Sequence, residues 1–186
     1  MKLLRACFSL VTLLSSGCAD DVSREINPDT GLSKWIIRSD GVQIELVPVT
    51  RDYIQAVFAS RGLPPPVIEK IGNYCMFGTI IRNGTGEMLS NRLAEWRYVT
   101  RDGVRHAPKT KSEWVSEWQA EGVAFRWLLM AEDQVYAPED WGQGFTTVAL
   151  PPDTEFDLEY VWEQNGNRHT GSIRGMKCAP QGITNE

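Results

Sequence analysis

Apolar and polar residues alternate along much of the chain after residue 33, which is the pattern of half-buried β-strands. The alternation is clearest over residues 42–49 and 155–163, and it recurs over 34–38, 94–98, 124–129 and 145–149. Asp40-Gly41 and Asn165-Gly166 fall between such segments, and both dipeptides favour hairpin turns because they adopt positive φ readily. A final strand is expected to end near Cys178. Trp96, Trp127 and Trp162 occupy inward positions of these strands and are predicted to lie in the core.

The spacing changes to that of a helix between residues 50 and 72. From Thr50, a typical N-cap residue, apolar side chains recur at helical intervals up to Gly62, and a second short helix is expected over 66–72. The pattern therefore predicts a mainly β protein, an immunoglobulin-like β-sandwich of about seven to eight strands with a short helix pair near residues 50–72. A β-barrel is the alternative. We expect the helix pair to pack over an open end of the sheets, although a functional insertion is also open.

The first 17 residues have the composition of a secretory signal. Lys2 and Arg5 precede a short apolar stretch over residues 6–14, and small residues follow it. This stretch is much shorter than the roughly 20 residues that a membrane-spanning helix requires. Residues 1–17 are therefore predicted to be a signal peptide that directs export.

Leu14-Ser15-Ser16-Gly17-Cys18 resembles the lipobox of bacterial lipoproteins, with Ser15 where the motif usually has its leucine. The resemblance implies that Cys18 is acylated after cleavage and that the protein is held on the periplasmic side of a membrane. Ala19 after the cysteine favours the outer membrane. If ordinary signal cleavage occurs instead, the product is soluble in the periplasm. The polar residues 18–33 are then expected to form the lipidated N-terminus and a flexible tether, followed by a single domain over 34–180 and a tail over 181–186.

The cysteine count fits an exported protein. Cys7 leaves with the signal and Cys18 carries the lipid, so that Cys75 and Cys178 remain in a compartment where disulfides persist. We expect these two to form a structural disulfide; two free thiols with a redox or copper role are the alternative. Met76, Met176 and His169 are the residues that would assist copper binding, although no dense methionine or histidine motif is present.

Charge and motifs argue against several classes of function. The formal net charge is −5 before the basic leader is removed, and no cluster of lysine and arginine is present, so nucleic acid is not an expected partner. Neither His106 nor His169 has a neighbour at metal-ligand spacing, and no nucleophile motif occurs. Asn83-Gly84-Thr85 and Gly142-Gln143-Gly144 are both interpreted as turns. The sequence predicts no enzyme, no cofactor and no metal site.

The seven tryptophans are the most unusual feature of the composition. Trp114 and Trp118 are four residues apart and are expected to share one face of a short helix, while Trp141 lies in a polar loop. These three form the candidate binding surface, and packing of Trp114 and Trp118 onto a sheet is the alternative that the sequence favours. The sequence favours a non-enzymatic module that binds an envelope protein or supports an assembly. A ligand-binding module, for carbohydrate or copper, is the alternative.

Overall fold

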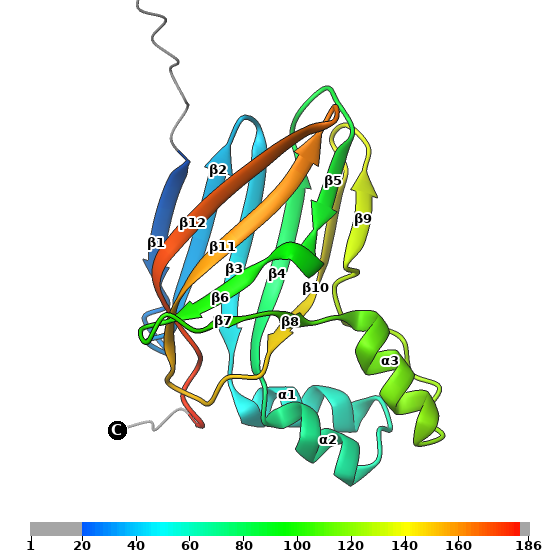
Figure 1. Cartoon of the computed structure of the whole chain (residues 1–186). Helices are drawn as coiled ribbons and strands as arrows, with labels where there is room; N and C mark the ends of the chain where they lie inside the picture. The colour runs from blue at the N-terminus through cyan, green and yellow to red at the C-terminus, as the bar shows by residue number, and fades with distance from the viewer. Residues whose placement is uncertain (1–19, 183–186) are drawn as a thin grey trace, which may run out of the picture.

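Two antiparallel β-sheets lie face to face, and three helices cover one end of the pair (Figure 1). The computed structural model describes residues 20–182. The first sheet has six strands in the order β1 (Asp21–Ile26), β2 (Ser33–Ser39), β3 (Val42–Val49), β4 (Cys75–Asn83), β10 (Trp141–Val148) and β8 (Pro108–Lys109). Its first four strands are neighbours in sequence order, unlike the interleaved strands of immunoglobulin domains.

The second sheet is built around the long strand β11. Its order is β7 (Arg105–His106), β6 (Arg97–Thr100), β11 (Glu155–Gln164), β5 (Leu89–Arg92) and β9 (Asp133–Tyr136), and β12 (Asn167–Lys177) also pairs with β11. A single 3-10 turn over Leu93–Glu95 separates β5 from β6. The predicted β-sandwich with a short helix pair is confirmed. The strands of residues 20–182 outnumber the expected seven or eight, because short edge strands extend both sheets.

The main core lies between the two sheets and follows from the alternation in the sequence. On β11 the inward residues Phe156, Leu158, Tyr160 and Trp162 are all buried, and the Cys75–Cys178 disulfide lies in the same core. The disulfide joins β4 of the first sheet to the segment after β12, with the two Cα atoms 5.4 Å apart. This confirms the predicted pairing.

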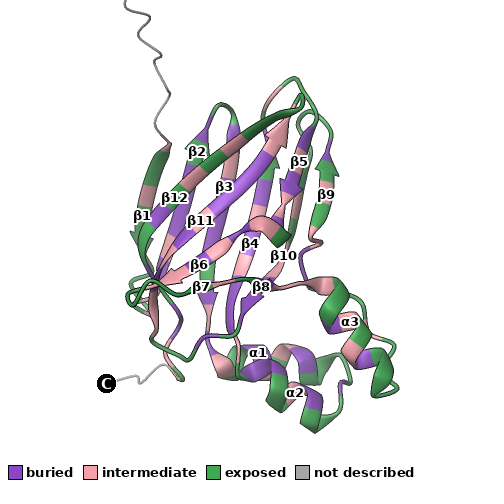
Figure 2. Cartoon of the chain, viewed as in Figure 1, coloured by how far each residue is buried: buried purple, intermediate pink, exposed green. Residues whose placement is uncertain are grey.

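A second core forms where the helices α1 (Arg51–Ser60), α2 (Pro65–Gly72) and α3 (Lys111–Ala120) pack on the outer face of the first sheet. Each helix turns its buried positions toward this cluster (Figure 2). The helix pair begins at Thr50, which caps α1 as predicted. Met76 alternates with Cys75 on β4 and therefore points to the helices, away from the core between the sheets.

Helix α3 is fixed by its own sequence and by a half-buried lysine, Lys109. Thr110 and Glu113 form a reciprocal capping box at its start. Trp114 Nε1 donates a hydrogen bond of 2.9 Å to Thr147 Oγ1 on β10. The Lys109 ammonium lies 3.9 Å from the centre of the Trp114 ring and 2.5 Å from a Glu117 carboxylate oxygen. These contacts dock α3 onto the sheet edge.

Four segments differ from the sequence prediction. The strand expected over 94–98 begins only at Arg97, because Leu93–Glu95 forms the 3-10 turn. The expected tether is wrong over Asp21–Ile26, which forms β1, because these residues pair in full register with β2. Residues 124–129 form no strand: only Leu129 makes an isolated bridge, to Phe145, and Phe125 and Leu128 pack against the helical cluster instead. Gly142-Gln143-Gly144 lies within β10 and not in a turn.

The glycines in β10 have a steric reason. A Cβ added to Gly144 would lie 2.5 Å from the backbone nitrogen of Met130, and one added to Gly142 would lie 2.7 Å from the Tyr136 ring. Both glycines therefore permit close packing of the chain against β10. The predicted signal peptide, and Cys18 with it, lies outside the described residues.

Candidate functional site

A groove of about 690 Å³ opens on the outer face of the first sheet, beside the helices. Val47 on β3, Gly78 on β4 and Phe145 on β10 stand opposite one another in the sheet register and form its floor. Gly78 has no side chain, and a Cβ built there would meet only the Val47 carbonyl oxygen, at 3.8 Å. The hollow therefore exists because one position in the middle of an otherwise apolar strand is glycine.

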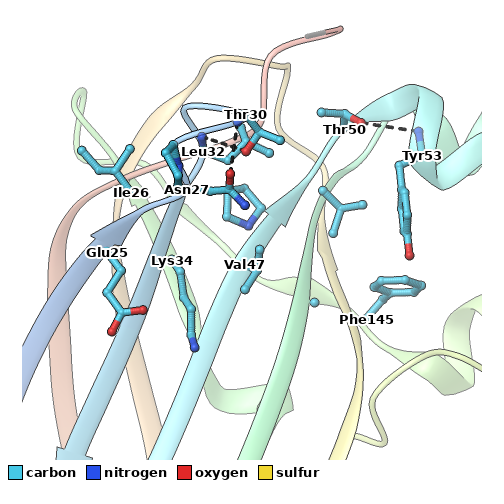
Figure 3. A pocket seen from close by; sticks show the side chains of 14 residues that line it. Glu25, Ile26, Asn27, Thr30, Leu32, Lys34, Val47, Thr50, Tyr53 and Phe145 are labelled. Carbon is cyan, nitrogen blue, oxygen red and sulfur yellow. Dashed lines mark hydrogen bonds between the residues drawn. The ribbon is translucent and has the colours of Figure 1, made fainter.

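The walls of the groove come from α1 and from the β1–β2 turn. Tyr53 extends from the first turn of α1 toward Phe145, and its side chain is 57% exposed (Figure 3). The Thr50 hydroxyl accepts a hydrogen bond from the Tyr53 backbone nitrogen. This N-cap fixes the position of Tyr53 in the first turn of α1. On the opposite wall the Asn27 side chain accepts bonds from the backbone nitrogens of Asp29 and Thr30. This Asx turn shapes the wall and places the exposed Ile26 at its edge.

The charged residues of the groove lie at one side. Glu25 and Lys34 face each other across β1 and β2, and both line the groove. The Lys34 ammonium is 2.7 Å from a carboxylate oxygen of Glu45 on β3. Burial by itself would raise the pKa of Glu45, but hydrogen bonds from Lys34, Gln43 and Arg82 outweigh it and hold that pKa below its ordinary value. This part of the sheet face therefore carries a fixed, ionised network.

The three predicted surface tryptophans do not form one surface. Trp114 and Trp118 stack on each other, and both are completely buried in the helical cluster. They cannot form an exposed docking patch, and this part of the prediction is wrong: burial of the helix face against the sheet decided their role. Trp141 stays 49% exposed at the start of β10, where the Arg82 guanidinium lies 5.3 Å from the centre of its ring.

The predicted core tryptophans also divide. Trp96 and Trp162 are buried between the sheets as expected, whereas Trp127 is 72% exposed. The alternation around Trp127 is too short to specify a strand once its neighbours have turned toward the helices. Its exposure makes it a surface residue that the sequence assigned to the core.

The residues considered for copper are not brought together. Met76 packs in the helical cluster and Met176 between the sheets. His169 stacks on Trp162, while Met176 pairs with Phe156, so the histidine and this methionine lie toward opposite ends of β12. Within residues 20–182 there is no group of three or more histidine, cysteine or acidic side chains placed to hold a metal ion.

Asn83 of the sequence Asn83-Gly84-Thr85 is buried and has a structural role. Its amide nitrogen donates to the backbone oxygens of Glu87, Tyr136 and Ala137, at 2.7, 3.2 and 3.0 Å. The side chain thus ties the β4–β5 loop to the segment after β9, in agreement with the interpretation of this motif as a turn.

Sequence reasoning missed the groove entirely. Two signals pointed to it: Gly78 interrupts an apolar strand, and Tyr53 lies off the buried stripe of its helix. Comparison with protein-family models and with curated proteins finds no match to this chain. None of the helices in the described part of the chain is long and apolar enough to span a bilayer.

Proposed function

We propose that this protein is an exported lipoprotein, acylated on Cys18 and held on the periplasmic side of the outer membrane. It acts without catalysis as a binding module for another protein of the cell envelope. The groove between Tyr53, Val47 and Phe145 receives an extended, apolar segment of that partner. The observation that carries the proposal is the groove itself, an apolar hollow that lies between the helical cluster and the charged network of Lys34, Glu45 and Arg82.

The free edge of β1 supports an extended partner. Among the strands of residues 20–182, β1 pairs with β2 alone, and its last residues, Glu25 and Ile26, line the groove. An edge strand presents unpaired backbone groups to which another chain can add as a further strand. A segment that pairs with this edge would reach the groove at its Ile26 wall, and the chain that continues beyond β1 could then enter the hollow.

The disulfide and the leader support the compartment. The Cys75–Cys178 bond requires an oxidising environment to persist, and the lipobox-like sequence supplies the route to it. Acyl chains anchor a protein without a spanning helix.

The binding proposal is tested with two groove variants and a matched control. Gly78→Val fills the floor, and because its Cβ has room in the fold, stability should be retained. Tyr53→Ala removes the aromatic wall. Val135→Ala is the control, since Val135 is 57% exposed, like Tyr53, but lies on the second sheet.

The measurement is recovery of the partner from cross-linked envelopes, followed by its affinity for the purified domain. We expect each groove variant to weaken binding by about 1–2 kcal/mol, which is roughly five- to thirtyfold in Kd, and the control to bind as the natural chain does. Unchanged affinity in both groove variants would refute the assignment.

A second candidate is binding of a carbohydrate, and the aromatic wall is the observation that favours it. Tyr53 and Phe145 present ring surfaces in one hollow, and sugars stack on such rings. Titration of the purified domain with cell-wall glycans distinguishes the two candidates. Saturable binding that Tyr53→Ala abolishes, with no partner recovered, favours the carbohydrate.

A further inference from the structure

The end of the sandwich where β1 begins lies at the first described residues. Asp21, the first residue of β1, pairs with Arg38 near the end of β2. One residue earlier, the Asp20 carboxylate accepts a hydrogen bond from the Tyr160 hydroxyl on β11. Burial and the neighbouring carboxylate raise the pKa of Tyr160, so the phenol stays protonated as the donor. The folded domain therefore includes Asp20.

Four loops meet at this same end, opposite the helices (Figure 1). We call them the loop platform; they are the β2–β3 turn at 40–41, the β4–β5 loop at 84–88, the β9–β10 loop at 137–140 and the β11–β12 turn at 165–166. Hydrogen bonds link them: Gly84 N donates to Gly41 O at 2.9 Å, and Gln164 Nε2 donates to Thr85 Oγ1 at 2.5 Å. With the three bonds from Asn83, the platform is one connected surface.

The chain between Cys18 and the first residue of the folded domain is very short. Only Ala19 separates Cys18 from Asp20. Two residues of fully extended chain span at most roughly 7 Å. An acyl group on Cys18 would therefore leave the start of β1 almost no freedom to move away from the membrane.

We propose that acylated Cys18 holds the domain end-on at the bilayer, with the loop platform against the lipid headgroups and the helices and groove directed away. This inference rests on the acylation included in the proposed function. The mouth of the groove then lies a full strand length from the platform, because the six residues of β1 cover roughly 20 Å. The groove meets a partner that arrives from the periplasm.

The charge of the platform makes the contact depend on the covalent anchor. Its four loops contain Asp40, Glu87, Glu139 and Asp140 and no lysine or arginine. Anionic headgroups repel such a surface within about 8 Å at physiological ionic strength. The unacylated domain should therefore not bind vesicles that contain phosphatidylglycerol.

The experiment measures energy transfer from the protein to a membrane. The acylated mature chain is placed on phosphatidylcholine vesicles that carry an acceptor dye on a lipid headgroup. A donor dye is attached through an azido-phenylalanine at Gly86 in the platform or at Ser116 on α3. A Cβ at Gly86 meets nothing within 4 Å and Ser116 is exposed, so neither label disturbs the fold.

We expect transfer from Gly86 to be several-fold greater than from Ser116. In a matched control, a flexible Gly/Ser insert of about 20 residues after Ala19, with an average span of roughly 25 Å, should remove most of this difference. Equal transfer from the two positions in the acylated chain of natural length, or greater transfer from Ser116, would overturn the orientation.

Intact-mass spectrometry separates the two levels of the proposal. A mature chain without an acyl mass on Cys18 overturns the anchor and the orientation together. An acylated chain with equal transfer overturns the orientation alone and leaves the anchor in place. The groove is tested independently, since the Gly78→Val and Tyr53→Ala variants report on partner affinity.

Discussion

The two outer faces of the sandwich differ in how their side chains are satisfied. On the second sheet the outward residues of β11 are acidic except for the buried Val161, and arginines from neighbouring segments pair with the three glutamates. The pairs are Arg92 with Glu163, Arg105 with Glu159 and Arg101 with Glu155, and Arg168 on β12 pairs with Glu95 in the same way. Figure 2 shows that β12 is largely exposed. Ion pairs therefore satisfy many of the charged side chains on this face.

On the outer face of the first sheet, only some of the side chains are covered by helices or paired with opposite charges. Helices cover the region around Met76, and the network of Lys34, Glu45 and Arg82 neutralises another region. Between these regions Gly78 leaves an apolar hollow that no side chain fills. Exposed ion pairs contribute little to the free energy of folding or binding, whereas burial of apolar surface in a complex is favourable. This difference between the faces is the reason why the proposed binding site lies on the first sheet.

The largest effect on stability should come from a substitution in the helical cluster that covers part of the first sheet. Trp118→Ala removes a buried ring from the helical cluster and should lower the free energy of unfolding by about 3–5 kcal/mol. Trp127→Ala, at an exposed position, should change it by no more than about 0.5 kcal/mol. Urea denaturation followed by circular dichroism compares the two. Similar losses would mean that Trp127 is also packed.

The ionised network on the first face should give the next largest effect. Glu45→Gln should cost roughly 1.5–3 kcal/mol at neutral pH, because three donors lose a charged acceptor. The pKa of Glu45 in the fold lies below the ordinary value of 4.5. The stability it contributes is therefore present above that value and is lost as the pH falls through the lowered pKa. Unfolding measured along a pH series should show the natural chain and the variant converging in acid; a constant difference would contradict this.

The hollow itself should tolerate added volume. Gly78→Ala should change the free energy of unfolding by less than about 0.5 kcal/mol, because its Cβ has room. Gly144→Ala on β10 should cost about 1–3 kcal/mol, because the added carbon would press on the Met130 backbone. Thermal unfolding of the two variants makes the comparison. Equal costs would show that the floor of the groove is closed in solution.

The smallest effect belongs to the second face. Arg105→Ala breaks the exposed pair with Glu159 and should cost about 0.2–1 kcal/mol. The cost should fall further at about 1 M salt, where the screening length is about 3 Å. A large, salt-independent loss would give this face a structural role that exposed ion pairs do not have.

Local sequence predicted the parts of the fold that depend on neighbouring residues. Asp40-Gly41 and Asn165-Gly166 form their turns with positive φ at all four residues, and Thr50 caps α1. The alternation on β3 and β11 correctly assigned inward and outward residues. These features are determined within a few residues, because backbone sterics and period-2 burial act locally.

Tertiary contacts decided the roles of the tryptophans. The same apolar ring is buried at Trp118 and exposed at Trp127, and no local pattern distinguishes them. Burial depends on what packs opposite, and for Trp118 the opposing residues come from α1 and from the segment after α3. The strand pairing of residues 21–26 could likewise not be predicted from the sequence, because a polar edge strand lacks the apolar alternation of an interior strand.

The sequence by itself determined the main interior strands, the helix pair and the two cysteines that could join. Only the tertiary structure brought Cys75 to Cys178 and set Gly78 beside Val47 and Phe145 beneath Tyr53. A hollow has no sequence pattern of its own, because it arises where strands distant in the chain align one missing side chain with the spaces around it.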